Sequence, residues 1–211
     1  GTTVKIYGMD TTLDFIFTLK SAIIPEKPNT IIWYFDTEQE VLLEFTKLLQ
    51  ALDPDVLTGY NIFGFDMSYL YDRARENGIE QQFCKLGKLQ DTACEYKEKV
   101  LSSSALGDNL LKFIDMDGRV LIDIMKVVQR DHKLDSYKLD NVANHFMKMN
   151  KHDVSPNDIF RLQKGTAADR KVIADYCVQD CALCNKLMMK LEILANNIGM
   201  SNVCNVPLSY I

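Results

Sequence analysis

The sequence lacks long apolar runs, a leader-like start and stretches of low complexity. No segment reaches the roughly 18 apolar residues that a membrane-spanning helix needs. The first residues, GTTVKIYGMD, have no charged start followed by an apolar core, as a signal peptide would. The sequence therefore predicts an intracellular protein that is not secreted and has no membrane partner.

Positive charge is also in deficit. The chain has 24 Lys and Arg against 29 Asp and Glu, a formal net charge of −5. This balance argues against binding nucleic acid through a bulk positive field, because affinity for phosphates grows with the number of basic contacts. It does not exclude a nuclease, whose metal ions supply positive charge that a residue count misses.

Paired cysteines of the kind found in zinc knuckles are missing. In an intracellular protein the six cysteines are expected to be reduced thiols. Cys177, Cys181 and Cys184 are spaced to lie on one helical face, so a zinc site is an alternative there. Without a fourth ligand nearby, the favoured interpretation is that they are small buried residues on a core-facing helix.

What the sequence does have is the composition and periodicity of a single globular α/β domain. Of its 211 residues, 47% are apolar and 25% are charged. Thr37 and Glu40 form a capping-box pattern that predicts the start of a helix. Strands are expected at residues 4–7, 15–19, 31–35 and 56–59, and further helices at residues 65–76, 123–130, 139–147, 156–162 and 167–196.

A turn signal in the middle of the chain predicts a β-hairpin. Asp117 and Gly118 lie between the strand-like residues 109–114 and 119–122. Residues 88–107, which are polar and end in serines, are expected to be the least structured part of the chain.

Residues 53–66, DPDVLTGYNIFGFD, carry the first candidate site. They predict a short buried strand that delivers Asn61 and Asp66 to its carboxyl end, where open α/β sheets place their chemistry. A structural alternative is that Asn61 is a turn residue and Asp66 a helix cap.

A second acid lies inside the predicted long helix. Tyr176 and Asp180 are one turn apart and therefore share a face. Several neighbours of Asp180 are apolar, which weakens the alternative that it is a solvated surface carboxylate.

Together these segments resemble the exonuclease domain of family B DNA polymerases, of the kind found in large DNA viruses and in delta-type enzymes. Tyr60-Asn61-x-x-x-Phe65-Asp66 resembles the second exonuclease motif, and Tyr176-x-x-x-Asp180 resembles the third. The segments GRVLIDIMKVVQRDHKL and SYKLDNVANHFM resemble those that precede the third motif. The final segment, NVPLSYI, resembles the exit from the exonuclease domain toward the polymerase palm.

This resemblance implies one exonuclease domain over residues 1–211, with an edge at about 203–211 that leads toward the palm. The fold expected is a ribonuclease H-like α/β fold with a mixed central sheet flanked by helices. The strand at residues 56–59 should lie in the interior of that sheet, and the first strand of the fold should be missing from the chain.

The resemblance also assigns roles to residues. Asp66 and Asp180 would be metal ligands for two Mg²⁺ or Mn²⁺ ions, which suit carboxylate oxygens and drive phosphodiester hydrolysis. Tyr176 would orient the attacking water, so Asp66, Tyr176 and Asp180 form the catalytic set. Asn61 and Phe65 would contact the terminal nucleotides of the DNA, Phe65 by stacking on unpaired bases.

The first motif of the family, an Asp-x-Glu pair on the first strand, poses a separate question. Asp36-Thr37-Glu38 matches the Asp-x-Glu pattern, but it follows the third strand and lies at the capping box. It is therefore interpreted as a decoy, a chance match that is not the first motif. The true pair is expected just before Gly1. The isolated chain is then predicted to be a poor nuclease, because it holds only two of the four metal acids.

Two other hypotheses remain open. One is a free-standing exonuclease that uses Asp36 and Glu38, and the other is a non-catalytic nucleic-acid-binding module on the same fold. For the favoured hypothesis the partners are a single-stranded 3′ primer end, the rest of the polymerase chain and a sliding clamp. The location is the nucleus or a viral replication site.

Overall fold

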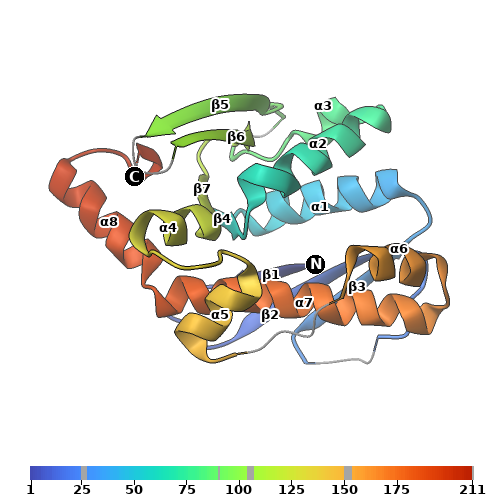
Figure 1. The fold of residues 1–211 in the computed structure, drawn as a ribbon. Helices are drawn as coiled ribbons and strands as arrows, with labels where there is room; N and C mark the ends of the chain where they lie inside the picture. The colour runs from blue at the N-terminus through green and yellow to red at the C-terminus, as the bar shows by residue number, and fades with distance from the viewer. Residues whose placement is uncertain (25–27, 90, 104–106, 150–153, 211) are drawn as a thin grey trace.

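The computed structural model describes residues 1–24, 28–89, 91–103, 107–149 and 154–210 and confirms a mixed α/β fold (Figure 1). The strands are β1 Thr2–Lys5, β2 Thr12–Leu19, β3 Thr30–Phe35, β4 Val56–Gly59, β5 Glu95–Ser103, β6 Gly107–Asp115 and β7 Val120–Asp123. The helices are α1 Glu38–Leu52, α2 Met67–Glu76, α3 Glu80–Phe83, α4 Ile124–Asp131, α5 Leu139–Met147, α6 Pro156–Lys164, α7 Ala167–Lys190 and α8 Ile193–Cys204, with a π-helix η1 at Ile62–Asp66 and a 3-10 turn η2 at Leu208–Tyr210.

The described strands form three small sheets. In the first, β2 pairs antiparallel with β1 and parallel with β3. In the second, β4 and β7 are parallel, and in the third β5 and β6 form an antiparallel ribbon. The mixed strand directions were predicted, but the interior position of β4 was wrong. Among the described strands only β7 pairs with β4, because no other described strand lies along its second edge.

The predicted hairpin across Asp117 and Gly118 was also wrong. The strands on either side belong to different sheets, because β6 pairs with β5 and β7 pairs with β4. Gly118 does adopt the left-handed conformation that the turn signal implies, with φ 78°. A tight turn fixes only the local change of direction. The partner of β6 is β5, which lies in the segment that was expected to be least structured.

Helix α1 begins where the capping box predicts. The hydroxyl of Thr37 accepts a hydrogen bond from the Glu40 amide at 3.2 Å, and the Glu40 carboxylate accepts one from the Thr37 amide at 3.0 Å. These reciprocal bonds satisfy amides that the first turn leaves free. The helix then buries Leu42, Leu48 and Leu49.

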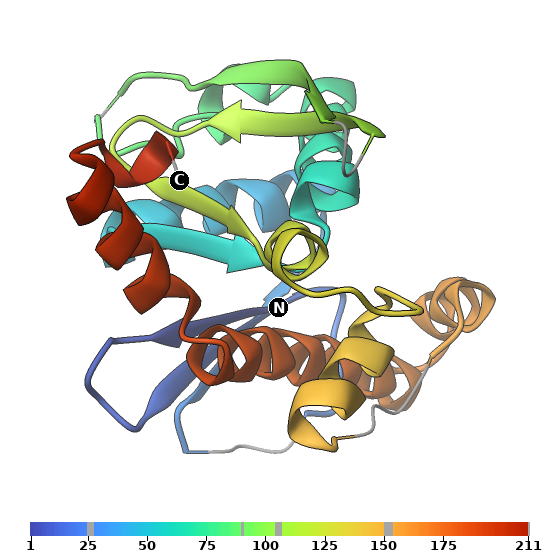
Figure 2. The same cartoon turned by 60° about the vertical axis from the view of Figure 1, so that its left-hand side comes forward.

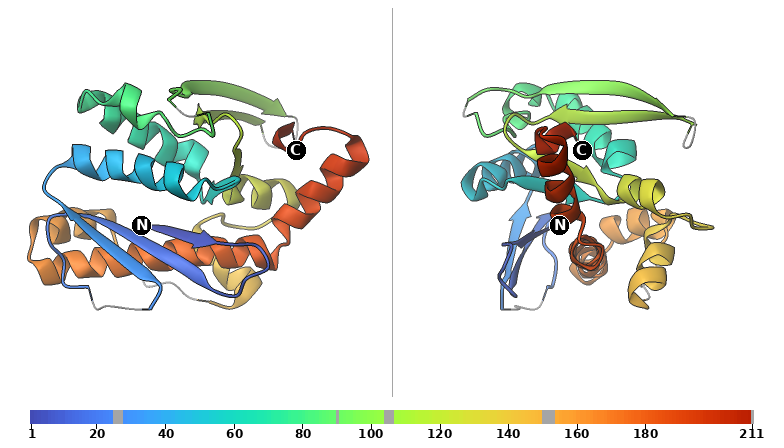
Figure 3. Two further views of the ribbon diagram at one scale, coloured as in Figure 1. Left: turned by 180° about the vertical axis from the view of Figure 1, so that it is seen from behind. Right: turned by 90° about the vertical axis from the view of Figure 1, so that its left-hand side faces the viewer.

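Helix α7 is the axis around which the lower half of the molecule is built. It packs along β1 and β2 of the first sheet, and α5 and α6 pack against it (Figures 2 and 3). The helix was predicted to continue to residue 196, but it ends at Lys190. Glu192 adopts a left-handed conformation with φ 50°, so α8 leaves in a new direction.

Two hydrophobic clusters form the described core. The first joins α1, α2, α3 and β6 and is centred on fully buried side chains such as Leu49, Phe83 and Ile114. The second joins β7, α4, α5 and α7, with Ile124, Val128 and Leu187 at its centre. Within the described residues, no helix combines the length and apolar character needed to cross a bilayer.

Candidate active site

The candidate site begins at the carboxyl ends of strands β4 and β7, which lie side by side. They are parallel, and their last residues, Gly59 and Asp123, are register partners. Because parallel strands place their carboxyl ends at one edge, the segments that follow them are neighbours. A side chain at position 59 would collide with Ile62, since a Cβ there would lie 2.5 Å from Ile62 Cγ2. Glycine therefore allows the chain to fold back tightly after β4.

The turn after β4 has an unusual backbone. Asn61 is left-handed, with φ 60° and ψ 30°, a conformation that asparagine tolerates better than most residues. Its carbonyl accepts hydrogen bonds from the amides of Gly64 and Phe65, both at 3.1 Å. The π-helix η1 then carries the chain into α2. Such π turns occur often at functional sites.

Asp66 is the last residue of η1 and borders α2. Its side chain makes no capping hydrogen bond, so the interpretation of Asp66 as a helix cap was wrong. The residue reaches the surface, yet the surrounding protein is dense enough that desolvation raises the pKa of its carboxyl, and the nearby charge of Asp123 adds to this rise. A cation at this position would relieve both effects.

Phe65 projects from the same turn. Its ring is 59% exposed and stacks on the ring of Tyr69, which is 51% exposed. The ring centroids are 5.6 Å apart and the planes differ by 10°. An exposed stacked pair of this kind offers an aromatic surface to a nucleobase next to Asp66.

The second half of the site lies on α7, where Tyr176 and Asp180 are both half-buried. Cys184, one turn beyond Asp180, links them to the first half. Burial, together with the charges of Cys181, Asp180, Asp66 and Asp123, raises the pKa of the Cys184 thiol to about 12. Asp66, Asp123 and Asp180 therefore lie near enough to this thiol for their charges to act on it.

Contacts with β1 hold α7 in this place. The thiol of Cys181 donates to the carbonyl of Gly1 at 3.3 Å, and the amide of the Asn185 side chain donates to the carbonyl of Thr3 at 3.4 Å. Cys184 is buried, as the favoured interpretation of the cysteines expected, whereas Cys177 and Cys181 are only half-buried.

The donor chemistry of the site suits a hard divalent cation. Carboxylate oxygens of the type that Asp66 and Asp180 carry are the ligands preferred by Mg²⁺ and Mn²⁺. Cys184 stays protonated at neutral pH because of its raised pKa, so it does not offer a thiolate to softer metals. Across the part of the chain that the structure describes, no three His, Cys, Asp or Glu residues are grouped to hold a metal ion.

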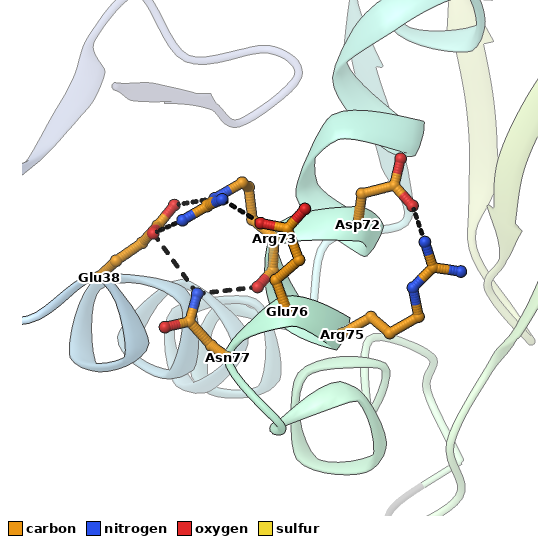
Figure 4. A network of polar contacts seen from close by, with 6 residues as sticks. All are labelled: Glu38, Asp72, Arg73, Arg75, Glu76 and Asn77. Atoms are coloured by element: carbon orange, nitrogen blue, oxygen red, sulfur yellow. Dashed lines mark hydrogen bonds and ion pairs between the residues drawn. The ribbon is translucent and has the colours of Figure 1, made fainter.

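The Asp36-Thr37-Glu38 segment lies elsewhere and has other partners. Asp36 is exposed at the N-terminus of α1, as predicted for a decoy. Glu38 accepts hydrogen bonds from Arg73, with Nε to Oε1 at 2.7 Å, and from Asn77 at 3.4 Å (Figure 4). This network ties α1 to α2, so the alternative that Asp36 and Glu38 serve as the first exonuclease motif was wrong.

Sequence reasoning underestimated Asp123. The sequence pattern placed Asp123 only at the start of the helix expected at residues 123–130, and it does cap α4 by accepting a hydrogen bond from the Met125 amide at 3.0 Å. Its carboxylate also accepts from the amides of Asn61 and Phe63 in the turn after β4. This contact forms because β4 pairs with β7, and no local pattern in the sequence predicts that pairing.

Comparisons with known proteins bear on the family to which the chain belongs. A family model described as DNA polymerase family B, exonuclease domain, matches residues 2–142. The DNA polymerase of Pyramimonas orientalis virus is 42% identical over 268 aligned residues, which cover the whole chain and 22% of that protein. The DNA polymerase delta catalytic subunit of Dictyostelium discoideum is 43% identical over 203 residues, covering 93% of the chain and 18% of the subunit. The chain therefore spans about a fifth of the length of these relatives.

Proposed function

Because the chain belongs to the exonuclease domain family of the family B DNA polymerases, we propose that it removes the 3′-terminal nucleotide of a DNA primer as the proofreading part of a longer polymerase. The observation that supports this proposal best is the contact between α7, which carries Asp180, and β4, the strand that leads into the turn carrying Asp66. These two elements carry the two motifs on which the resemblance rests. DNA and the remainder of the polymerase chain are the proposed partners.

In the proposed reaction Asp66 and Asp180 would hold Mg²⁺ or Mn²⁺ through carboxylate oxygens. Two bound ions would supply a more acidic water and would stabilise the negative charge that develops on the leaving oxygen. Two carboxylates are fewer than such a pair of ions needs, so further acids complete the site. The Asp-x-Glu pair implied by the family resemblance is our candidate for them.

The remaining residues of the site act on the substrate. The phenol of Tyr176, on the same helix as Asp180, orients the attacking water. Phe65 stacks on a terminal base, and Asn61 contacts the terminal nucleotide from the turn. Unpaired ends reach such a surface more readily than paired ones, because a paired end must first lose its pairing and stacking energy.

The wider assignments follow from the proposed reaction. A proofreading domain works where DNA is replicated, so we propose the nucleus or a viral replication site as its location. Polymerisation belongs to the rest of the parent chain, and a sliding clamp is a further partner of that parent.

The test uses the polymerase that carries this domain and a primer with a 3′ mispair. We expect Asp66→Asn and Asp180→Asn each to reduce removal of the mispaired nucleotide by at least about 100-fold, because each removes a charged metal ligand. Extension of a matched primer should remain unchanged. Asp117→Asn, a neutralised acid in the turn before β7, is the matched control and should digest like the wild type.

The same experiment distinguishes a non-catalytic binding module. In that case the wild type would bind single-stranded DNA but would not release nucleotides at any Mg²⁺ or Mn²⁺ concentration. The two site variants would then differ from the control only in binding.

A further inference from the structure

Asp123 is the most deeply buried acid in the candidate site, with 2% of its surface exposed. Its carboxylate accepts three backbone hydrogen bonds. Oδ1 accepts from the amides of Asn61 at 2.8 Å and Met125 at 3.0 Å, and Oδ2 accepts from the amide of Phe63 at 3.1 Å. A buried carboxylate is costly unless such donors surround it.

Only one of these bonds belongs to helix capping. The bond from Met125 satisfies a free amide in the first turn of α4, as many N-cap residues do. The other two bonds come from the turn after β4, more than fifty residues earlier in the chain. A residue that served only as a cap would not need them.

The two extra bonds fix the turn on both sides of a buried residue. Ile62, between the two bonded amides, is 8% exposed, and Met67, at the far end of η1, is 4% exposed. The turn is therefore held by Asp123 at its start and by the first hydrophobic cluster at its end. Asp66 lies between these anchors, next to Met67, so its direction depends on both.

We propose that Asp123 is a positioning residue for the nuclease site, which holds the backbone of Asn61 and Phe63 and so fixes the turn from which Asp66 would bind metal. The inference rests on the proposed nuclease function and extends it to a residue that touches neither the nucleotide nor the cleaved bond. Asp123 acts through the turn, and its effect reaches the metal through Asp66.

The test compares two variants that keep the cap of α4 but lose all or part of the hold on the turn. Serine and asparagine are both good N-cap residues, so Asp123→Ser and Asp123→Asn should preserve α4. Serine is too short to reach the turn. Asparagine can accept at Oδ1, but its Nδ2 would face the amide of Phe63, donor against donor.

In the polymerase that carries this domain, we expect both variants to lower removal of a 3′-mispaired nucleotide by about tenfold or more, because misplaced ligands weaken metal binding. The Mg²⁺ concentration that gives half-maximal rate should rise, and matched-primer extension should stay unchanged. Hydrogen exchange supplies a readout independent of activity. Amides of residues 61–66 should exchange faster, while those of α4 keep their protection.

Thr37→Ala is the control, since it removes the cap of α1, a helix that carries no site residue. It should alter neither the Mg²⁺ dependence nor exchange in the turn. The proposal is overturned if Asp123→Ser and Asp123→Asn match the wild type in rate, Mg²⁺ dependence and exchange, or if exchange rises equally throughout the domain. If Asp180→Asn leaves digestion intact, the proposed function fails, while exchange in residues 61–66 still tests the hold by Asp123.

Discussion

Arg119 illustrates how a single buried side chain can join distant parts of the chain. Its guanidinium is almost fully buried and donates to four backbone carbonyls while pairing with Asp53 at 3.0 Å. The carbonyls belong to Leu49, Pro54, Leu86 and Gly87. One arginine therefore satisfies the end of α1 and the loop after α3 at once.

Loss of this side chain should be costly. We expect Arg119→Ala to lower the free energy of unfolding by about 3 kcal/mol, because it leaves buried carbonyls without donors. Urea denaturation followed by circular dichroism measures the change. Arg75→Ala is the matched control: Arg75 lies on the surface of α2 and pairs with Asp72 at 3.0 Å, so its removal should cost less than about 1 kcal/mol. Equal losses for the two variants would contradict this view of Arg119.

Gly64 offers a second test at the same scale. A Cβ at this position would lie 2.3 Å from Oδ1 of Asn61. The short Asn61 side chain can rotate away, so we expect Gly64→Ala to change stability by no more than about 1 kcal/mol. The mispair-removal rate should nevertheless fall toward that of Asn61→Ala, because the amide is displaced. An undiminished rate would show that the placement of the Asn61 side chain does not matter.

Single residues were predictable from the sequence where local spacing carries the information. Tyr176 and Asp180 share a helix that the periodicity predicts, and Asn61 and Asp66 follow a strand bounded by turn residues. The hold of Asp123 on the turn was not predictable, because it depends on which strand pairs with β4. Their roles in nuclease chemistry remain predictions until the variants are measured.

At the scale of elements, the ion pair between Glu38 of α1 and Arg73 of α2 should make the stability of the domain depend on pH. Glu38 and Arg73 are each about one-third exposed, and hydrogen bonding to Arg73 lowers the pKa of Glu38 below its ordinary value of 4.5. A lowered pKa means that the folded state binds the proton more weakly than the unfolded state. The pair therefore stabilises the domain above pH 4.5, and this contribution is lost as the pH falls through the lowered value.

We expect Glu38→Gln to reduce stability at pH 7 by about 0.5–1 kcal/mol, after allowance for solvent screening. The difference from wild type should vanish in acid, below the folded pKa of Glu38. Urea titrations at a series of pH values measure it. Glu44→Gln, on the same helix and paired only with the exposed Lys47 in the described structure, is the control and should show a smaller change. A difference that persists unchanged in acid would refute the role of the Glu38 charge.

Element boundaries were predictable where a cap marks them. The predictions were wrong where tertiary pairing determines the boundary. The capping box fixed the start of α1, and β4 lies at the predicted residues. The end of α7 was missed because Glu192 enters a left-handed conformation that no glycine or proline announces. The β5 strand was missed because its residues pair with β6 without a buried apolar face of their own to signal it.

At the scale of the whole molecule, the two hydrophobic clusters should respond independently to small changes. Ile79 belongs to the first cluster and Ile193 to the second, and both are buried. We expect Ile79→Val and Ile193→Val each to cost about 1 kcal/mol through the loss of a methylene group. The double variant should cost the sum within about 0.5 kcal/mol, because the sites share no partners. Urea denaturation measures all three, and a large deviation from the sum would show that the clusters act as one.

The proposed site draws on both of these regions. Asp66 adjoins Met67 in the first cluster, whereas Asp180 lies on α7 with Leu187 in the second. The α/β fold class could be predicted from the alternation of strands and helices, but the division into two clusters was not predicted. The separation of the strands into three sheets could not, since it depends on which edges meet in space.

The π-helix between β4 and α2 has a consequence for the length of the chain. The amide of Met67 bonds to the carbonyl of Ile62, five residues back, so this turn holds one residue more than an α-turn would. Removing one residue would require α2 to rotate by about 100° relative to β4, because each residue of an α-helix turns by that angle. Either Met67 would leave the core or the amides held by Asp123 would be pulled away. Relatives of this domain should therefore vary in composition between β4 and α2 far more readily than they gain or lose a residue there.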